Sequence, residues 1–235
     1  MEQCQTWIEV QSMGITIRCL AHASFQIRTD DLNIYVDPST KNTGLKESDF
    51  DPADLILVTH EHGDHCDPKL IKKIRKMGKP IIAPPSCKKT LEKAGTVWPL
   101  AEGEAMQMGD GKTSIIAVPA YNVKRFRKPG EPFHPKGFGV GYIIKVDGKR
   151  IYHAGDTDHI PEMERLGEID VALLPSGDTY TMDFEDSFEA VKTIQPEVAI
   201  PMHLWDKDPT AYKERVEAET ETKVVLLSEG EEYEL

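Results

Sequence analysis

The sequence predicts an α/β fold, in which short strands and amphipathic helices recur along the whole chain. Runs rich in β-branched and aromatic residues occur in both halves, and stretches with apolar residues at helical spacing follow some of them. No Gly/Ser-rich linker or low-complexity stretch divides the 235 residues. We therefore expect a single domain over residues 1–235, with two β-sheets or half-domains that share one core and with helices outside.

The expected strands of the first half are short and bounded by turn-prone residues. Asp37-Pro38 stops one of them, since proline has no N–H for the ladder. The run 55–58 is continuously apolar, as expected for a strand that is buried on both faces. A helix is expected after it, because Asp67 can cap the helix N-terminus and Pro68 suits its first turn. The expected strands are 14–20, 23–28, 32–36 and 55–58.

The second half repeats this pattern of strands and helices. Asp147-Gly148 is a hairpin signal between two expected strands. A helix is expected from about Asp183 to Pro196, and Asp208-Pro209 repeats the cap-plus-proline start of a helix. We interpret the acidic C-terminal end as a solvated tail rather than a site. The expected strands are 113–118, 140–146, 150–153, 171–174, 198–200 and 223–227.

The composition excludes several classes of protein. Asp and Glu number 40 against 28 Lys and Arg, a net charge of -12, so binding of nucleic acid through bulk charge is not expected. The four cysteines are irregularly spaced and do not form a disulfide framework. Met1–Gln5 carries no secretory signal, and no apolar stretch reaches the roughly 18 residues of a membrane helix. We expect a soluble, cytoplasmic protein without a membrane partner, and a homo-oligomer stays open.

Histidines and an aspartate gather directly after the buried strand that ends at Val58. Two histidines at i and i+2 can point together at a first cation, and the aspartate and a third histidine can turn to a second one. Imidazole and carboxylate together suit zinc, iron(II) or manganese rather than calcium. A solvated loop that happens to be rich in histidine is the alternative. The four residues are His60, His62, Asp64 and His65.

Two further residues follow strand ends and can complete such sites. Asp156 lies just past the strand 150–153, and one carboxylate can bridge two cations roughly 3.5–4 Å apart. The alternative for Asp156 is a cap for the segment after it. His203 follows the strand 198–200 and is expected as a ligand, although a lone histidine there could also be structural.

These motifs resemble those of the metallo-β-lactamase superfamily. The sequence has HxHxDH after a strand, then Gly-Asp-Thr at 155–157 and Pro-Met-His at 201–203, and the resemblance extends over about residues 14–205. The nearest branch is that of metal-dependent hydrolases resembling L-ascorbate-6-phosphate lactonase. The resemblance implies a four-layer αββα sandwich with a dinuclear site at one edge between the sheets. Further segments that support it are Ala21-His22-Ala23-Ser24-Phe25, Tyr35-Val36-Asp37-Pro38, Val118-Pro119-Ala120-Tyr121-Asn122 and Thr181-Met182-Asp183.

The resemblance also implies a ligand set, in which one ligand is not matched directly. The family usually places a histidine after the strand over 113–118, but here Pro119-Ala120-Tyr121-Asn122 follows. His134 comes later, across a basic loop, and is our candidate, because such sites generally need three protein ligands. Asn122 is a poorer alternative, and His134 is otherwise a loop residue. The implied ligands are His60 and His62 for the first metal, Asp64, His65 and His203 for the second, and Asp156 as the bridge.

The segment Lys124–Lys128 is the one dense basic run in this acidic chain, and it lies on a loop that should overhang the site. We expect Arg125 and Arg127 to recognise an anionic substrate, such as a sugar phosphate, through forked contacts. A solvated loop without function is the alternative. His22, beside a strand, either faces the substrate or forms a hydrogen bond at a turn.

These features together predict a metal-dependent hydrolase with a small-molecule substrate. We expect two divalent metal ions, zinc or alternatively manganese or iron(II), with a bridging hydroxide that attacks an ester, lactone or phosphodiester. Asp64 or Asp156 is expected to orient that hydroxide. The sequence contains no nucleophile elbow, P-loop or dinucleotide glycine fingerprint. Two alternatives stay open, namely a nuclease or phosphodiesterase of the same fold and a catalytically silent metal-binding protein.

Overall fold

Two seven-stranded β-sheets form the centre of the protein, whose structure is a computed structural model describing residues 14–41 and 43–235. Met1–Gln5, where no secretory signal is expected, lies outside the described residues. The first sheet has the order β16-β1-β2-β3-β4-β5-β6 and is antiparallel from β16 to β3 and parallel from β3 to β6. Its strands are β1 Thr16–Ala21, β2 Ser24–Arg28, β3 Asn33–Val36, β4 Leu55–Leu57, β5 Ile81–Ala83, β6 Val97–Pro99 and β16 Glu232–Glu234.

The second sheet has the order β15-β14-β13-β12-β11-β8-β7. It is antiparallel from β7 to β12 and parallel from β12 to β15, so both sheets change from antiparallel to parallel pairing. The Asp147-Gly148 turn joins β11 to β12 as an antiparallel hairpin, as predicted. The strands are β7 Ala105–Gln107, β8 Ser114–Ala120, β11 Gly139–Val146, β12 Lys149–His153, β13 Val171–Pro175, β14 Val198–Met202 and β15 Lys223–Val224.

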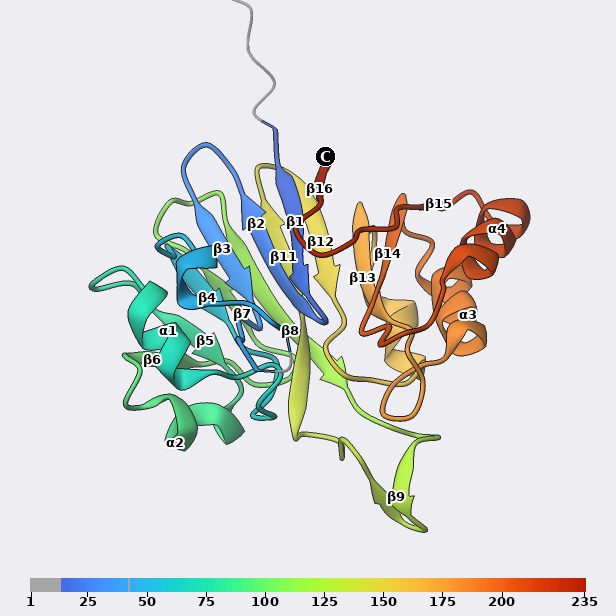
Figure 1. Ribbon diagram of the computed structural model, residues 1–235, viewed down its shortest axis with the longest axis horizontal. Coiled ribbons are helices and arrows are strands. Elements are labelled where there is room, and N and C mark those ends of the chain that lie inside the picture. Colours follow the sequence, from blue (N-terminus) through green and yellow to red (C-terminus); the bar gives the residue numbers. More distant parts are fainter. Residues whose placement is uncertain (1–13, 42) are drawn as a thin grey trace, which may run out of the picture.

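The helices cover the two outer faces of the paired sheets. Figure 1 shows α1 and α2 beside the first sheet and α3 and α4 beside the second. Buried side chains of each helix pair pack against the outer face of the neighbouring sheet. This arrangement is the predicted four-layer αββα sandwich. The helices are α1 Pro68–Ile74, α2 Lys88–Leu91, α3 Phe184–Ile194 and α4 Thr210–Glu219, with 3-10 helices η1 Glu47–Asp49, η2 Pro85–Cys87 and η3 Pro161–Arg165.

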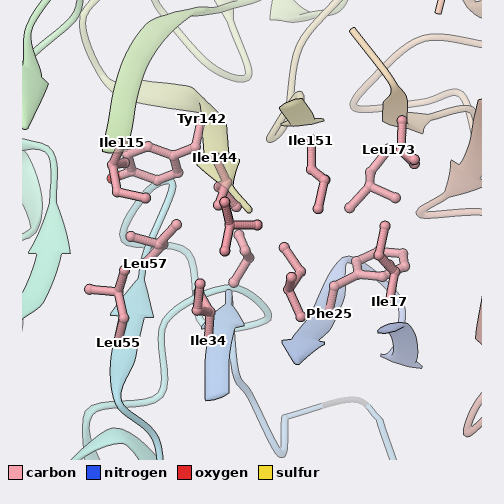
Figure 2. Close-up of a cluster of buried hydrophobic side chains, with 14 of the residues drawn as sticks. Ile17, Phe25, Ile34, Leu55, Leu57, Ile115, Tyr142, Ile144, Ile151 and Leu173 are labelled. Atoms are coloured by element: carbon pink, nitrogen blue, oxygen red, sulfur yellow. The ribbon is translucent and has the colours of Figure 1, made fainter. Parts of the chain in front are cut away.

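The main hydrophobic core lies between the sheets. Alternate side chains of the strands point inward from both sheets and meet face to face, as Figure 2 shows. The same core therefore holds the N-terminal and C-terminal halves of the chain together. Side chains labelled in Figure 2 are Ile17, Phe25, Ile34, Leu55 and Leu57 from the first sheet, and Ile115, Tyr142, Ile144, Ile151 and Leu173 from the second.

A small two-stranded sheet extends from the sandwich, formed by β9 Phe126–Lys128 and β10 Glu131–Pro132. Figure 1 shows β9 well away from the main sheets. The connection from β8 to β11 runs out along this hairpin and returns before β11. Residues 122–134, named the arm below, therefore form an excursion that begins and ends beside the sandwich.

Helix starts show where local sequence signals suffice. Asp67 caps α1 by accepting hydrogen bonds from the amides of Lys69 and Leu70, and Asp183 caps α3 by accepting from the amide of Asp186. The Asp67 cap is as predicted, and the Asp183 cap lies where the second helix is expected to begin. The start of α4 differs from its prediction.

Three predictions for the C-terminal region need correction. The helix expected to start with Asp208 as its cap starts one residue later, with Pro209 at the cap position, and the Asp208 carboxylate accepts from both the amide and the hydroxyl of Thr210. The acidic end is not simply a tail, since Glu232–Glu234 pairs antiparallel with β1. The strand expected over 223–227 is limited to the two residues of β15. In the part of the chain that the structure describes, no helix has the length and apolar character needed to cross a membrane.

Candidate metal centre

Segments that follow strand ends in both sheets bring the predicted ligands to one edge of the sandwich. The polar segments that follow β4, β12 and β14 meet there, together with the turn between β1 and β2. Strand ends are where layered α/β folds collect their chemistry, because the backbone leaves the sheet and exposes side chains at one edge.

The first group of facing ligand atoms comes from His60, His62 and His134, whose ligand atoms all lie within 4.8 Å of one another. The His134 Nε2 lies 3.2 Å from the His62 Nδ1, and the His60 and His134 ring centroids are 5.1 Å apart. The arm therefore returns His134 to the histidines after β4, where the predicted third ligand is needed.

The second group is formed by Asp64, His65, His203 and His22, whose ligand atoms meet the same 4.8 Å limit. The His65 Nε2 lies 3.8 Å from the Asp64 Oδ2, and the His65 and His203 rings lie roughly parallel with centroids 5.8 Å apart. His22 was expected either to face substrate or to form a hydrogen bond at a turn. Its Nε2 lies 3.6 Å from the Asp64 Oδ2, and its backbone carbonyl accepts from the His203 amide.

The Asp156 carboxylate lies between the two groups. Its Oδ1 is 3.3 Å from the His65 Nε2, while its Oδ2 is 3.4 Å from the Nε2 atoms of both His134 and His203. The His60 Nε2 is 4.0 Å away. Asp156 does not cap a helix, because η3 begins five residues later with Ile160 at its cap position. Its position between both groups is that of a bridging carboxylate.

Asp37 orients one ligand from outside the groups. Its Oδ2 lies 2.7 Å from the His65 Nδ1, and it also accepts bonds from the amide and hydroxyl of Thr59. A carboxylate that accepts from one ring nitrogen fixes the tautomer of a histidine. In neutral His65 the proton is therefore on Nδ1, and the Nε2 lone pair faces the centre. Sequence analysis treated Asp37 as a strand end and as part of a segment that supports the family resemblance, and assigned it no role at the site. The available signal was a carboxylate directly after a strand at the site edge.

Thr59 and Asn122 orient two further imidazoles. The Thr59 hydroxyl donates to Asp37 and therefore accepts from the His60 Nδ1, 3.0 Å away, so the His60 Nε2 faces the centre. The Asn122 Oδ1 accepts from the His134 amide and lies 2.9 Å from the His134 Nδ1. Asn122, the poorer ligand alternative, thus holds His134 in place instead of replacing it.

Burial and charge set the protonation of these groups. Burial lowers the pKa of His60 well below its usual value and lowers that of His134 to about 4, which keeps both imidazoles neutral and able to bind metal. Burial opposes ionisation of Asp156, yet His203 and His65 hold its pKa well below the usual range. Burial also disfavours protonated His65, but Asp156 and Asp37 outweigh it and raise the pKa of His65. A cation at its Nε2 would displace that proton.

Buried ligand atoms without partners provide a test of whether this site fits a metal. Within residues 14–41 and 43–235, the His60 Nε2, the His65 Nε2 and the Asp156 Oδ1 are buried and have no hydrogen-bond partner. Such atoms are costly to bury unless something binds them. Imidazole nitrogens and carboxylate oxygens suit zinc, iron(II) or manganese. The site therefore fits divalent metal ions of this kind.

Three other residues that are close in sequence to the ligands lie outside the ligand groups. The His153 Nε2 lies 2.9 Å from the carbonyl of Ala23 and its Nδ1 accepts from the Gly155 amide, a structural role. Cys66 is a buried free thiol, and burial raises its pKa to about 12, so it is not a thiolate ligand. The His159 Nε2 lies 2.9 Å from the Thr193 hydroxyl.

A cavity of about 470 Å³ opens onto the two ligand groups. Its volume is in the range of small-molecule sites. Three aromatic side chains and one arginine border it in addition to the ligand residues, and sequence reasoning identified only the arginine. The lining residues are His62, Gly63, Asp64, Arg127, Phe133, His134, Asp156, Tyr180, His203 and Trp205.

The structure separates the two arginines that were expected to bind substrate. Arg127 lines the cavity, but Arg125 does not. The buried Arg125 guanidinium instead forms ion pairs with Asp186, with Asp183 at 3.0 Å and with Asp158 at 3.3 Å. The expectation that Arg125 contacts substrate is therefore corrected, because its donors are directed into the protein by carboxylates.

Comparison with known proteins agrees with this fold and site. The profile of the family described as β-lactamase superfamily domain matches residues 16–203. The chain belongs to the metallo-β-lactamase superfamily. Within this superfamily it is 34% identical over 230 residues to a UPF0173 metal-dependent hydrolase of Pelotomaculum thermopropionicum, covering 92% of this chain and 98% of that protein.

Two further members of the metallo-β-lactamase superfamily support this assignment. A UPF0173 metal-dependent hydrolase of Pyrococcus abyssi is 36% identical over 235 residues, covering 94% of this chain and 100% of that protein. The crystal structure of a protein from Parabacteroides distasonis, described as a metal-dependent hydrolase, matches with a TM-score of 0.82 and 36% identity, covering 92% and 94%. The chain is thus a metal-dependent hydrolase of this superfamily, whereas the narrower likeness to L-ascorbate-6-phosphate lactonase stays a prediction.

Proposed function

We propose that the protein hydrolyses an ester, lactone or phosphodiester bond of a small anionic molecule with the help of two divalent cations. The observation that carries this proposal is the Asp156 carboxylate between two groups of ligand atoms, with oxygens 3.3–3.4 Å from imidazole nitrogens of both. Such a carboxylate suits two cations roughly 3.5–4 Å apart. The proposed ligands are His60, His62 and His134 for one cation, Asp64, His65 and His203 for the other, and Asp156 for both.

Cations at such sites polarise the bond under attack and lower the pKa of water to near neutral, which supplies a nucleophile without a reactive side chain. The protein then has to orient that water and remove its proton. Asp64 and Asp156 are the two predicted candidates. The Asp64 side chain is 24% exposed and lines the cavity, whereas that of Asp156 is 4% exposed. Asp64 is therefore the better proton acceptor, because it can return the proton to solvent.

His22 is suited to assist Asp64. The His22 Nε2 lies 3.6 Å from the Asp64 Oδ2 and has no hydrogen-bond partner elsewhere in the described part of the chain. Burial lowers the pKa of His22, with Asp64 opposing that change. A neutral imidazole at this distance can orient the carboxylate or contact the bound substrate, as its predicted substrate-binding role requires.

The position of Arg127 supports the proposal that the substrate is anionic. The other basic residues of the run 124–128 have carboxylate partners, since Lys124 pairs with Asp186, Arg125 with several aspartates and Lys128 with Glu131. Among the described residues, no carboxylate lies within ion-pair distance of Arg127. Its guanidinium borders the cavity and is free to form forked contacts with a carboxylate or phosphate.

The experiment is a screen of the purified protein, loaded with zinc, manganese or iron(II) and in metal-free form, against lactone, carboxylic ester and phosphodiester panels. We expect metal-dependent turnover of anionic members of one panel. Unchanged hydrolysis by the metal-free protein contradicts the proposal. Stoichiometric metal binding without turnover on any panel favours the alternative of a catalytically silent metal-binding protein, and turnover of polynucleotides favours a nuclease.

A further inference from the structure

Three aromatic rings border the cavity in a continuous row that sequence analysis did not anticipate. The Phe133 and Tyr180 ring centroids are 4.8 Å apart, and those of Tyr180 and Trp205 are 6.3 Å apart. The row begins at Arg127, whose guanidinium lies 5.2 Å from the centroid of the Phe133 ring. It ends beside the ligands, because the Trp205 ring centroid lies 5.4 Å from that of His203.

Two of the three rings are open to solvent. Tyr180 is 38% exposed and Trp205 is 51% exposed. Both belong to the small set of large apolar side chains that remain exposed in the described residues, and both line the same cavity. A cluster of exposed aromatic surface inside a concave site is characteristic of ligand binding rather than of ordinary surface.

The backbone that presents these rings is unusual. Asp178 and Thr179 precede Tyr180 with φ of 66° and 64°, and His203 and Trp205 have φ of 56° and 53°. Aspartate and histidine tolerate left-handed backbone better than most residues, but it is strongly disfavoured for the β-branched Thr179 and the bulky Trp205. Strain of this kind persists where the surroundings hold side chains in a functional position.

The charge and shape of the cavity lining limit which ligands can bind there. One end of the row is a guanidinium without a carboxylate partner, and the other end adjoins the metal ligands. The rings of Phe133, Tyr180 and Trp205 connect the two ends along this side of the cavity. An anionic molecule bound at this site therefore meets aromatic surface beside its reacting group, and flat groups gain most from such surface.

We propose that Tyr180 and Trp205 bind a flat, apolar group of the substrate next to the hydrolysed bond, so that the substrate class is small anionic esters or lactones carrying an aromatic or similarly planar group. This inference rests on the proposed function of the same site. It assigns specificity to Tyr180, in the loop after β13, and to Trp205, two residues beyond His203 in the loop after β14.

The test uses phosphonates, whose carbon–phosphorus bond resists hydrolysis, so binding is measured without turnover. Metal-loaded full-length protein of measured metal content is titrated calorimetrically with methylphosphonate, phenylphosphonate and cyclohexylphosphonate. We expect phenylphosphonate to bind about tenfold more tightly than methylphosphonate, with cyclohexylphosphonate between them. Trp205→Ala and Tyr180→Ala should each remove most of that preference and leave methylphosphonate binding unchanged, while Trp205→Phe should retain it.

Trp98→Ala is the matched control. Trp98 lies on β6, is 41% exposed and does not line the cavity, so this variant should keep the full preference. Far-ultraviolet circular dichroism and metal content verify that each variant is folded and loaded.

Several outcomes overturn the inference. Equal binding of methylphosphonate and phenylphosphonate by the wild type, or an unchanged preference in both alanine variants, contradicts the aromatic surface. Equal binding of cyclohexylphosphonate and phenylphosphonate contradicts the specificity for flat groups. Failure of every phosphonate to bind metal-loaded protein also overturns the inference. All of these outcomes leave the proposed metal-dependent hydrolysis standing, because the substrate panels test it separately.

Discussion

At the scale of single residues, ligand imidazoles are oriented through the ring nitrogen that faces away from the centre. An acceptor on that nitrogen fixes the tautomer and directs the other nitrogen toward the cation. The acceptor differs from one ligand to the next, being a carboxylate, an amide oxygen or a hydroxyl. The pairs are Asp37 with His65, Asn122 with His134, and Thr59 with His60.

Asp37→Asn tests this orientation with little change in shape. We expect metal affinity to fall about tenfold to a hundredfold, because the amide keeps one acceptor for His65 but loses the charge and the second bond to Thr59. Competition against a chromophoric chelator measures the affinity. Asp31→Asn, at an exposed turn, is the control and should match the wild type. Unchanged affinity in Asp37→Asn contradicts a role for Asp37 in holding the ligand.

The metal ligands could be predicted from sequence, and their supporting residues could not. His60, Asp156 and His203 follow strand ends, and strand ends are visible as apolar runs. The role of Asp37 depends on which strand lies beside which, because β3 and β4 become neighbours only in the sheet. Arg125 was assigned to substrate because charge in sequence does not reveal that carboxylates surround it.

At the scale of elements, the arm delivers both His134 and Arg127 to the site, and buried carboxylates hold its base. The fully buried Asp158 accepts from the backbone amides of Val123 and Lys124, at 2.7 and 2.6 Å. Arg125 extends this anchorage to Asp186 on α3. The arm is thereby fixed to the second sheet's helix layer before it reaches the cavity.

Two arginine variants separate anchoring from recognition. Arg125→Met leaves the buried Asp158 without its cation and leaves Asp186 with Lys124 alone, so we expect the free energy of unfolding to fall by about 3 kcal/mol. Arg127→Met removes an exposed side chain and should change stability by no more than about 0.5 kcal/mol. It should instead weaken methylphosphonate binding about tenfold. Urea denaturation and calorimetry measure the two quantities.

The opposite pattern would contradict this division. If Arg125→Met weakened methylphosphonate binding while leaving the unfolding free energy unchanged, Arg125 and not Arg127 would be the residue that recognises the anion.

The loops after β13 and β14 contact each other closely, which makes Gly177 a sensitive position. A Cβ at Gly177 would lie 1.8 Å from the carbonyl oxygen of His203, so the His203 loop must move in Gly177→Ala. We expect a loss of at least about 2 kcal/mol in unfolding free energy, together with weaker metal binding. Thermal melts and chelator competition measure both. Gly109→Ala has open space around the new Cβ and should behave as the wild type; equal behaviour of the two variants contradicts the account.

Elements were predictable where local chemistry determines them. The cap at Asp67, the helix start near Asp183 and the hairpin at Asp147-Gly148 depend on neighbouring residues and are confirmed. The three-residue strands β5, β6 and β7 carry too few residues for a periodic pattern and exist because neighbouring strands pair with them. The same reason applies to β16. Its acidic residues were predicted to be a tail, but in the fold they pair with β1.

At the scale of the whole molecule, an acidic chain contains a site proposed to attract anions. The net charge is -12, but two divalent cations would add four positive charges against two carboxylates, Asp64 and Asp156, beside Arg127. The cations would also join segments from both sheets, since His60 follows β4 and His203 follows β14. Bound metal would therefore stabilise the same contact between the two halves that the shared core stabilises.

Removal of metal should lower the stability of the whole fold. A cation held at about 1,000 times its Kd stabilises the folded state by about 4 kcal/mol. For a chain of this length we expect chelation to lower Tm by about 10 °C, and zinc to restore it. Differential scanning calorimetry of the metal-loaded, chelated and reloaded protein measures this. An identical Tm in all three states would show that the ligand groups hold no cation.

The proposed metal centre holds two cations with Asp156 between them. Anomalous diffraction at the zinc absorption edge, from crystals of zinc-loaded protein, tests it most directly. We expect two peaks roughly 3.5–4 Å apart, with the Asp156 carboxylate in contact with both. One peak should lie beside His60, His62 and His134, and the other beside Asp64, His65 and His203. A single peak, or peaks that Asp156 does not contact, would contradict the proposed centre.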